Sequence, residues 1–368
     1  MGMGLGDSLR VTLFGESHGQ CVGALVEGIP PGTPIDSDSL ARDLSMRKPG
    51  RKGLSSRSEI DNCEIVSGIH EGKATGWPVL MLARNEDAKS SDYGFLPEHP
   101  RPGHADMVEA IRNEGHNDPR GGGSQSARLT LGIVAAGSQA RSLLDGAEWS
   151  CKAHLHSIGG IYSRPLFELD MTTEYVEGTD MARLNCLDPD AVGPMSELIE
   201  SVRMDRDTIG SSVELIIDGL PIGVGEPWFD GIEPSLARGL MAIPGARAVE
   251  FSHGTESSRM RGSEHNDMWL PGGDTPTLEG SDSGRADGSL GGRSTGAPIR
   301  VIVHFKPPSS LPREQFTLHL PSNQVRSLKV GGRHDPVIGP RAAPVVEAVA
   351  ILVICDLGMM GGFLGNQD

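Results

Sequence analysis

The sequence predicts an α+β fold in which mostly antiparallel sheets pack against helices. Its apolar runs are short, long loops separate them, and helical patterns lie between only some of them. A doubly wound parallel sheet would alternate strands and helices regularly along the chain. The 368 residues include 50 glycines and 26 prolines, which indicates many turns but not low-complexity disorder. This length allows two domains or one elaborate fold.

The N-terminal part of the chain predicts four strands and one helix. Asp36 is a typical N-cap, and Leu40 and Leu44 share one face of a helix over 37–47, which ends near Pro49. Turns rich in Gly and Pro bound the apolar runs, as is typical of strands. The expected strands cover residues 11–14, 21–26, 64–69 and 78–82.

The rest of the chain predicts strands and helices in mixed order. A helix is expected after Gly121-Gly122-Gly123, from about 126 to 144, because Leu129, Ile133 and Ala136 recur at helical spacing. Pro344 is expected to open a final apolar helix. The other expected helices cover residues 105–113, 194–204 and 234–241, and the other strands cover 153–159, 211–219 and 299–305.

Two long-range features stand out along the chain. Residues 24–32 (ALVEGIPPG) and 215–223 (LIIDGLPIG) end alike, in a strand, a glycine, an aliphatic residue and a proline, which suggests an internal pseudo-repeat. Residues 262–298 are rich in Gly, Ser and Asp and longer than an ordinary connection. We interpret this segment as a functional loop that a ligand orders.

The charge balance argues against nucleic acid and membranes as partners. The chain has 33 Lys and Arg against 49 Asp and Glu, a formal charge of −16, which opposes broad attraction to a polyanion. An anionic ligand therefore needs a local basic island. Residues 42–57 provide one, with Asp43 as the single acidic residue. Because cations also favour helix C-termini, a solvated helix end is the alternative interpretation.

The cysteines and apolar runs favour a reducing, aqueous compartment. The five cysteines form no CxxC pair and are odd in number, so neither a zinc ribbon nor a disulfide framework is indicated. The longest apolar run, 348–355, is far shorter than the ~18 residues of a membrane span. The N-terminus lacks the apolar core of a secretion signal. We expect a cytoplasmic protein without a metal site.

The segment GESHG at 15–19 has two interpretations. It matches the G-x-S-x-G pattern of hydrolases, in which Ser17 would be the nucleophile. That pattern needs a strand, a turn and then a helix, whereas residues 20–31 have a strand signature that ends in two prolines. The alternative is an irregular loop that directs Ser17 and His18 at a ligand. His18 would then act as an acid or base near neutral pH.

Two later segments suit an anionic ligand. His104, in RPGHAD, lies at an expected helix N-terminus, a setting that suits proton transfer. The glycines of GGGSQSAR at 121–128 precede a helix, so backbone N–H groups and the helix dipole would favour an anion, and Arg128 adds charge. Neither the P-loop pattern nor the Rossmann fingerprint is present. A flexible loop before a helix is the alternative.

The C-terminal third adds two more polar turns. GGRHDPVIG at 331–339 brings Arg333, His334 and Asp335 together, and KPPSS at 306–310 places Lys306 directly after a strand. Each could be a surface turn. Together with the earlier loops they supply Arg, Lys, His, Ser and Gly, an inventory that suits phosphorylated ligands and acid–base chemistry.

From Arg10 almost to the C-terminus the chain resembles chorismate synthases. The shared motifs follow the family's order: RVTLFGESHG, GIPPG, RKPG, RPGHAD, GGG-x-x-SAR, GEP, LGG-x-S-x-G, KP-x-SS and GRHDP-x-x-G. The resemblance implies one domain over 1–368, a β-α-β sandwich and a cytoplasmic homotetramer. It implies a lyase of the shikimate pathway of aromatic amino acid biosynthesis. Such an enzyme removes phosphate from 5-enolpyruvylshikimate 3-phosphate by anti-1,4-elimination, giving chorismate, and requires reduced FMN.

The resemblance also implies roles for particular residues. His18 would protonate the departing phosphate, His104 would lie beside the N1/C2 carbonyl edge of the flavin, and Asp335 would assist proton removal from N5. The residues implied for substrate or nicotinamide nucleotide are Ser17, Arg47, Arg51, Arg128 and Arg333. The residues implied for FMN are Ser124, Gln125, Ser126, Pro244, Gly245, Gly291, Lys306, Pro307, Pro308, Ser309, Ser310 and Arg333.

The chain departs from the family pattern near the expected cofactor. Ser124 replaces an arginine of many members and Gln125 replaces a serine, which removes one positive charge. Pro244-Gly245 stands where Asn-Ala is usual, and Gly284 where Asn is usual. These changes predict weaker FMN binding than in members that have the arginine.

The sequence leaves two points open. The first is the source of the reduced flavin: either the chain reduces its own flavin with NADPH, or it depends on an external flavin reductase. The second is the function itself. A serine hydrolase based on Ser17 and a non-catalytic flavin- or phosphate-binding protein are the alternative functions.

Overall fold

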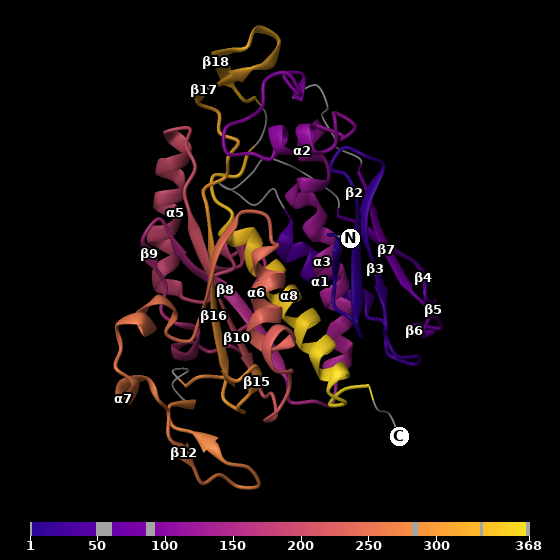
Figure 1. The fold of residues 1–368 in the computed structure, drawn as a ribbon, viewed down its shortest axis with the longest axis vertical. Helices are drawn as coiled ribbons and strands as arrows, with labels where there is room; N and C mark the ends of the chain where they lie inside the picture. The colour runs from indigo at the N-terminus through magenta and orange to yellow at the C-terminus, as the bar shows by residue number, and fades with distance from the viewer. Residues whose placement is uncertain (1, 49–60, 86–92, 282–285, 332–333, 366–368) are drawn as a thin grey trace.

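The computed structural model describes residues 2–48, 61–85, 93–281, 286–331 and 334–365. In this part of the chain, two five-stranded sheets enclose a layer of helices (Figure 1). All pairings within the two sheets are antiparallel. The predicted α+β class is therefore confirmed, and its layers are those of a β-α-β sandwich.

The first sheet comes from the N-terminal quarter of the chain. Its strand order is β1-β2-β3-β7-β4. Residues alternate between the core and the outer face, so that in β7 every second side chain is buried. The strands are β1 Gly4–Leu5, β2 Arg10–Gly15, β3 Cys21–Glu27, β4 Cys63–Ser67 and β7 Val79–Arg84.

The second sheet is covered on both faces. Its order is β11-β16-β10-β8-β9, and almost every residue of its central strand β10 is buried. Helix α5 (Pro189–Met204) and the short helix α4 (Asp180–Leu184) contribute to a small core next to β8 and β9. The strands are β8 Ser150–Ile158, β9 Ile161–Tyr162, β10 Ser211–Asp218, β11 Ala246–Phe251 and β16 Ile299–Phe305.

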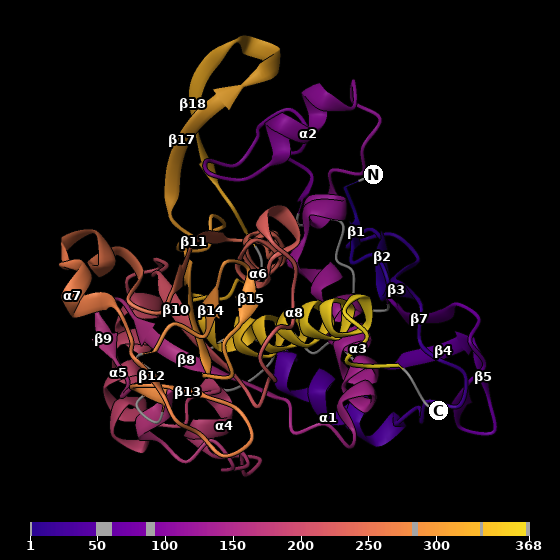
Figure 2. The same ribbon diagram turned by 60° about the horizontal axis from the view of Figure 1, so that its bottom comes forward.

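Four helices form the middle layer and join one large apolar core with the inner faces of both sheets. Helix α8 would by length and composition be able to cross a membrane, with a mean hydropathy of 2.0, but 83% of that stretch is buried here. It is thus the central core helix of the sandwich (Figure 2). The helices are α1 Ser37–Arg47, α3 Thr130–Ala140, α6 Ile232–Met241 and α8 Gly339–Met360.

The topology supports the internal pseudo-repeat. The first half runs β3, α1, β4, a small hairpin, β7 and α3, and the second half runs β10, α6, β11, a small hairpin, β16 and α8. The sheet orders β2-β3-β7-β4 and β8-β10-β16-β11 also correspond. The small hairpins are β5–β6 (Ile69–His70 and Lys73–Ala74) and β14–β15 (Ser289–Leu290 and Arg293–Ser294), each followed by T-G-x-P.

Two helices begin earlier than the sequence predicted, and for the same reason. Helix α5 begins at Pro189, not Pro194, because the Asp188 side chain accepts a hydrogen bond from the N–H of residue 190 as an N-cap. Helix α8 begins at Gly339, with Pro340 in its first turn, and contains Pro344 in its interior. In both helices the prediction assigned the start to the second of two prolines, although the first occupies the favoured N-terminal position.

The expected helix over 126–144 is present but changes type along its length. The 3₁₀ turns Ala127–Leu129 and Arg141–Leu144 flank α3. Ser126 caps the first turn by accepting a hydrogen bond from the N–H of Arg128. The expected helix over 105–113 is also present, as α2 (Asp106–Arg112).

The segment 262–298, expected as a loop, contains short regular elements in its described residues. These are the single-turn helix α7 (Gly262–His265), the hairpin β12–β13 (Trp269–Leu270 and Thr277–Leu278) and β14–β15. Leu278, Ala286 and Ala297 form a small apolar cluster. The segment therefore packs around a minor core of its own.

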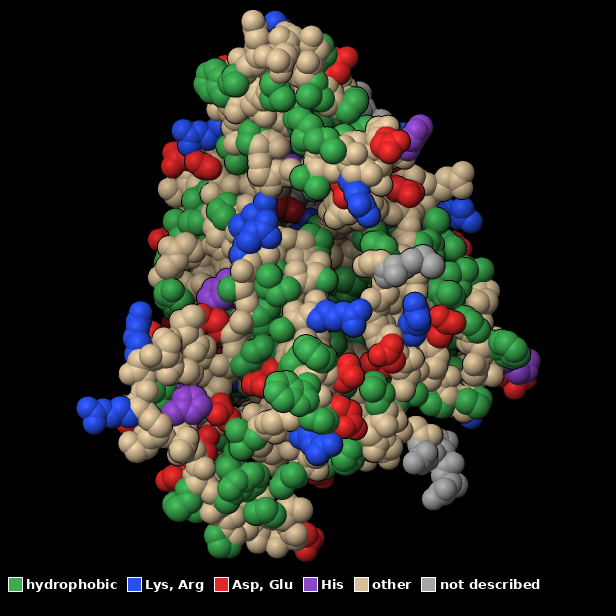
Figure 3. Space-filling view, viewed as in Figure 1, with side chains coloured by type: hydrophobic (Ala, Val, Ile, Leu, Met, Phe, Trp, Pro, Cys, Tyr) green, Lys and Arg blue, Asp and Glu red, His purple; other side chains and the backbone are tan. Residues whose placement is uncertain are grey.

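A hairpin that the sequence analysis did not predict projects from the body of the molecule. It consists of β17 (Glu314–His319) and β18 (Gln324–Lys329) and lies near α2 (Figures 1 and 2). Phe316 and Val325 of the hairpin are 69% and 70% exposed. Figure 3 shows apolar side chains gathered over this end of the molecule.

Candidate active site

A cavity of about 580 Å³ lies where loops of the two halves of the chain meet. Its walls come from the connection between β7 and α3 and from the connection between β16 and α8, which are equivalent in the repeat. The C-terminal ends of α1 and α6, also equivalent, complete it with Arg47 and with residues 242–245. The site is therefore built from matching loops of both halves.

Two adjacent glycines bring two histidines to this region. Gly121 and Gly122 have φ angles of +62° and +90°, which favour glycine. A Cβ atom on Gly121 would lie 2.4 Å from Cδ2 of His18, and one on Gly122 would lie 3.1 Å from Cε1 of His104. His18 comes from the turn between β2 and β3, whereas His104 comes from the loop before α2. Because neither glycine has a Cβ atom, both imidazole rings can pack against the same short stretch of backbone.

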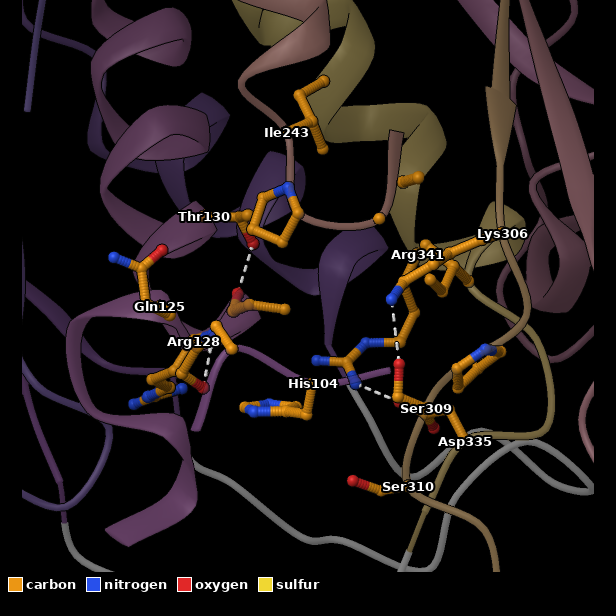
Figure 4. A pocket seen from close by; sticks show the side chains of 18 of the residues that line it. His104, Gln125, Arg128, Thr130, Ile243, Lys306, Ser309, Ser310, Asp335 and Arg341 are labelled. Carbon is orange, nitrogen blue, oxygen red and sulfur yellow. Dashed lines mark hydrogen bonds and ion pairs between the residues drawn. The ribbon is translucent and has the colours of Figure 1, made fainter. Parts of the chain in front are cut away.

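His104 lies in the cavity wall and is held from behind by two charged side chains. Its Nδ1 atom is 2.7 Å from Oδ1 of Asp106 and 3.1 Å from an Nη atom of Arg101. Burial alone would raise the pKa of Asp106, but the hydrogen bonds from Arg101 and His104 outweigh burial and hold this pKa well below its ordinary value. Figure 4 shows His104 between the wall with Gln125 and Arg128 and the wall with Ser309 and Asp335.

Tyr93 connects the two histidines. Its ring meets that of His18 edge to face, with centroids 5.1 Å apart. The guanidinium of Arg101 lies 5.6 Å from the centroid of the same ring, which is within cation–π range. Because Arg101 also contacts His104, the two imidazoles belong to one packed network.

Lys306, Ser309 and Ser310 form the wall of the cavity that lies opposite Gln125 and Arg128 (Figure 4). The Lys306 ammonium donates hydrogen bonds to the carbonyl of Gly103 at 2.6 Å and to the hydroxyl of Ser309 at 2.9 Å. Arg101 donates to the hydroxyl of Ser310 at 2.9 Å. Burial and the nearby charge of Arg247 lower the pKa of Lys306. This arrangement of cations and hydroxyls suits a phosphate group.

Arg47 and Arg128, which line the cavity, belong to a buried charge cluster. Asp61 lies between Arg47, whose Nη atom is 3.4 Å from Oδ2, and Arg128, which donates a short hydrogen bond to Oδ1. The three side chains are 2%, 1% and 8% exposed. Arg341 links this cluster to Asp335, because it pairs with the Asp335 carboxylate and donates to the carbonyl of Arg47.

The cavity brings together most of the residues that sequence reasoning had singled out. Among the described residues, the predicted members that line it are Arg47, His104, Gln125, Ser126, Arg128, Pro244, Gly245, Lys306, Pro308, Ser309, Ser310 and Asp335. His18 and Ser17 contact Gly121, which lines the cavity, without lining it themselves. Arg51 and Arg333 lie outside the described residues.

Three predicted cofactor residues do not line the cavity. Ser124 is exposed to solvent, and Pro307 lies between lining residues. Gly291 lies in the turn between β14 and β15, whose neighbour Gly292 packs against Glu226 and Gly231. Within this single chain, Gly291 is therefore apart from the cavity.

Sequence reasoning missed several residues of the network. Tyr93, Arg101, Asp106, Asp61 and Arg341 all contact predicted site residues. Arg101 and Asp106 belong to the same RPGHAD segment as His104 and could have been found there. Asp61 and Arg341 gave no signal, because only the fold brings them to the cavity.

The serine hydrolase alternative is not supported. A nucleophile elbow needs a strand, a turn and a helix, but Ser17 lies in a turn between the two antiparallel strands β2 and β3. Its backbone N–H donates to the carbonyl of Gly123. Ser17 therefore belongs to a hairpin turn that packs on the glycine loop.

A second cluster of titratable groups lies outside the cavity, where His154, His156 and Glu214 are close enough to share an ion. The geometry does not favour a metal. The N–H of Leu187 donates to Nδ1 of His154, which leaves the proton on Nε2, the atom that faces Glu214. A metal-ligating histidine has the opposite arrangement, with its second nitrogen donating to an acceptor.

The cavity fits a flavin mononucleotide. Its volume falls in the range of about 300–1,000 Å³ typical of ligand sites. Lys306, Ser309 and Ser310 offer donors for a phosphate. Apolar side chains that would suit a flat ring line the same space; they are Ile243, Pro244, Val337, Ile338 and Val345.

The fold and this cavity, which is lined by cationic side chains, hydroxyls and a histidine, are typical of an enzyme site for a phosphorylated ligand. The family model described as chorismate synthase matches residues 9–359. The chain belongs to the chorismate synthase family.

Named relatives are similar over nearly their whole length. A chorismate synthase of Aeropyrum pernix is 44% identical, over 96% of this chain and 92% of that protein. One of Methanosarcina mazei is 40% identical, over 98% and 97%. A crystal structure of a chorismate synthase shares the fold with a TM-score of 0.71 at 23% identity, covering 97% of this chain and 93% of that one. The resemblance inferred from the sequence motifs is thus confirmed.

Proposed function

We propose that this chain eliminates phosphate from 5-enolpyruvylshikimate 3-phosphate to give chorismate, as a lyase that requires reduced FMN. The observation that supports this most directly is the pair of histidines, His18 and His104, held on adjacent glycines at one cationic cavity. Losing phosphate from C3 while a hydrogen leaves C6 requires charge neutralisation at the leaving group and an acceptor for the hydrogen.

The chain's own residues would neutralise and protonate the leaving group. Arg47 and Arg128, which line the cavity and pair with Asp61, would bind anionic groups of the substrate. His18 would give a proton to the departing phosphate as the C3–O bond breaks. Asp335, held by Arg341, would assist proton removal from N5 of the flavin, as the family resemblance implies.

The cofactor would be held by the opposite wall. Lys306, Ser309 and Ser310 would bind its phosphate, while Pro244 and Gly245 would border its ring. When bound, reduced FMN supplies electron density to the breaking C–O bond and takes it back. His104 would provide a hydrogen-bonding nitrogen beside the ring.

An anaerobic assay tests the proposed function. Purified protein with chemically reduced FMN and the substrate should release phosphate and form chorismate. His18→Ala and His104→Ala should each lower the rate at least ~100-fold, as expected for loss of a general acid or base, while the circular dichroism spectrum is unchanged. Full activity of both variants would refute the assignment. Repeating the assay with NADPH and oxidised FMN shows whether the protein reduces its own flavin or needs an external reductase.

We also propose a cytoplasmic homotetramer. Exposed apolar side chains support association, because large apolar patches on a protein surface commonly mark interfaces. Trp228 and Phe229 are 82% and 89% exposed, and Val108 and Ile111 of α2 are exposed near the projecting hairpin. Light scattering after size exclusion should give four times the chain mass, and a monomer would contradict the proposal.

A further inference from the structure

We propose that Asp106 is a positioning residue that fixes the tautomer of His104 and so decides which ring nitrogen His104 presents to the cavity. The consequence for catalysis rests on the proposed function. The geometry itself involves only side chains of this chain.

The contacts around Asp106 form a closed set. Its Oδ1 atom lies 2.7 Å from Nδ1 of His104 and accepts a hydrogen bond from an Nη atom of Arg101 at 2.7 Å. Its Oδ2 atom accepts from Nε of Arg101 at 2.8 Å and from the backbone N–H of Arg101 at 3.0 Å. Both carboxylate oxygens are therefore fully engaged.

The donor and acceptor capacities of these groups determine the proton on His104. A carboxylate only accepts hydrogen bonds, and a guanidinium only donates them. At 2.7 Å from a carboxylate oxygen, Nδ1 must carry a proton, because a lone pair there would face the negative charge. The Nη atom of Arg101 donates one of its two protons to the same oxygen. With Nδ1 protonated, its 3.1 Å approach to Nδ1 is a contact between two donors.

Burial makes this arrangement strong. The side chains of Asp106 and Arg101 are 5% and 3% exposed, whereas that of His104 is 21% exposed. Charge-assisted hydrogen bonds of buried groups are shielded little by solvent. The Arg101–Asp106 ion pair is thus a rigid support for the imidazole. The imidazole is the part of this cluster that is most exposed to the cavity.

Nε2 is consequently the nitrogen available to a ligand. It lies next to Gly122, where a Cβ atom would be 3.3 Å away. In the neutral ring Nε2 accepts a proton, and in the charged ring it donates one. Lys306, which is bound to the carbonyl of Gly103, and the Asp335–Arg341 pair line the same cavity as the ring. Beyond Arg101, the other charged or titratable side chains among the described residues that line it are Arg47, Tyr93, Arg128, Arg247 and His334.

The variant Asp106→Asn should reverse the tautomer. The asparagine oxygen would stay with the backbone N–H and Nε of Arg101, because both are donors. Its NH₂ group would then face Nδ1 and donate to it, which moves the ring proton to Nε2. Asp106→Glu retains the charge and should restore part of the wild-type behaviour.

Asp188 provides a matched control. It accepts hydrogen bonds from the backbone N–H and from the guanidinium of Arg164 in the same manner, with atoms 2.8 and 2.9 Å apart, but neither hydrogen bond involves a histidine. Asp188→Asn therefore removes the charge of a buried carboxylate that binds an arginine away from the cavity, although Arg164 is 46% exposed, and asparagine can still cap α5. It should leave His104 unchanged.

Nitrogen-15 NMR of protein labelled at histidine measures the tautomer in the absence of flavin, with His104→Gln used to assign the signal. With the ring neutral, the wild-type signal should show Nδ1 protonated and the Asp106→Asn signal Nε2 protonated. A wild-type ring protonated on Nε2 overturns the proposal, and so does an unchanged ring in Asp106→Asn. The wild-type spectrum decides by itself if that variant fails to fold.

Kinetics test the consequence for the reaction. With reduced FMN, Asp106→Asn should lower kcat by at least about tenfold while KM for the substrate changes less than about twofold, since the loss concerns the transition state. Equal kcat values for Asp106→Asn and wild type would overturn the positioning role. If the wild-type protein releases no phosphate, the proposed function fails while the tautomer result still stands, so the two failures are distinguishable.

Discussion

Gly121 lies directly beneath the imidazole of His18. A Cβ atom at residue 121 would stand 2.4 Å from Cδ2 and 2.7 Å from Nε2 of that ring, and 2.8 Å from the Ser17 hydroxyl. The φ angle of +62° adds a second requirement for glycine. The position of His18 therefore depends on a residue without a side chain in a different loop.

Gly121→Ala should displace His18 and lower the rate of phosphate release at least tenfold. The left-handed backbone costs about 1–2 kcal/mol for a residue with a Cβ, and the collision with the ring adds about 1–3 kcal/mol of overpacking. Phosphate release under anaerobic conditions and urea unfolding measure the two effects.

Gly72→Ala is the control for backbone strain. Gly72 has a φ of +74°, and no atom lies within 4 Å of a Cβ built there. This variant should lose only the stability that the left-handed backbone costs, and it should retain wild-type activity. Equal losses of activity in the two variants would show that the His18 contact does not matter.

Asp61→Asn should destabilise the protein strongly. The carboxylate is 2% exposed and lies between the side chains of Arg47 and Arg128. Removing one partner of a buried charge cluster leaves uncompensated charge and costs about 3–5 kcal/mol. Urea unfolding at constant pH measures the loss, and added phosphate should raise the Tm of the variant more than that of the wild type.

Glu256→Gln provides the comparison for this prediction. It removes an ion pair with Arg259, but these side chains are 64% and 76% exposed. Exposed pairs contribute about 0–1 kcal/mol. A loss for Asp61→Asn no larger than for Glu256→Gln would contradict a structural role of the buried cluster.

The sequence predicted the fold class and most strands because local patterns determine them. The run Ile299–Phe305 has an apolar residue at every second position and is strand β16, in which these residues are buried, and Asp36 caps α1 as expected. Proline gave less reliable signals, since it is tolerated both in the first turn and in the interior of α5 and α8. The hairpin β17–β18 was missed because its exposed residues have no strong apolar alternation.

The site was predictable only where its residues lie in motif-bearing loops. His104 and Lys306 stand in such loops, and both line the cavity. Asp61 and Arg341 come from segments without a motif, and their pairing with Arg128 and Asp335 spans 67 and 6 residues of sequence. Contacts of this kind depend on how loops and helix ends pack within each half, which a linear pattern does not encode.

His156 should make the stability depend on pH between about 6.5 and 4. Burial lowers the pKa of His156 from 6.5 to about 4. Below pH 6.5 the unfolded chain binds a proton that the folded protein does not, so the free energy of unfolding falls as the pH decreases, by up to about 3 kcal/mol at pH 4. His156→Gln should remove this part of the pH dependence in urea titrations.

Glu214 should extend the loss of stability to lower pH. Burial opposes its charge, but His154 and Arg300 outweigh that effect and lower the pKa of Glu214 from 4.5 to about 2. The contribution of Glu214 to the free energy of unfolding is present above pH 4.5 and is lost as the pH falls toward 2. His70→Gln is the control for both residues, because the His70 side chain is 79% exposed; if it flattened the profile as much as His156→Gln, the buried cluster would not be the cause.

Ser124→Arg should strengthen FMN binding several-fold. Ser124 is exposed next to Gln125, whose amide donates a hydrogen bond to Glu109 at the edge of the cavity. An arginine there would add a positive charge on the Gln125 side of the cavity, worth about 1 kcal/mol for a partly exposed pair with an anionic ligand. Ser201→Arg, which adds the same charge on the exposed face of α5, should leave the affinity unchanged. Fluorescence titration of FMN measures all three proteins, and equal dissociation constants for Ser124→Arg and wild type would exclude residue 124 as a determinant of flavin affinity.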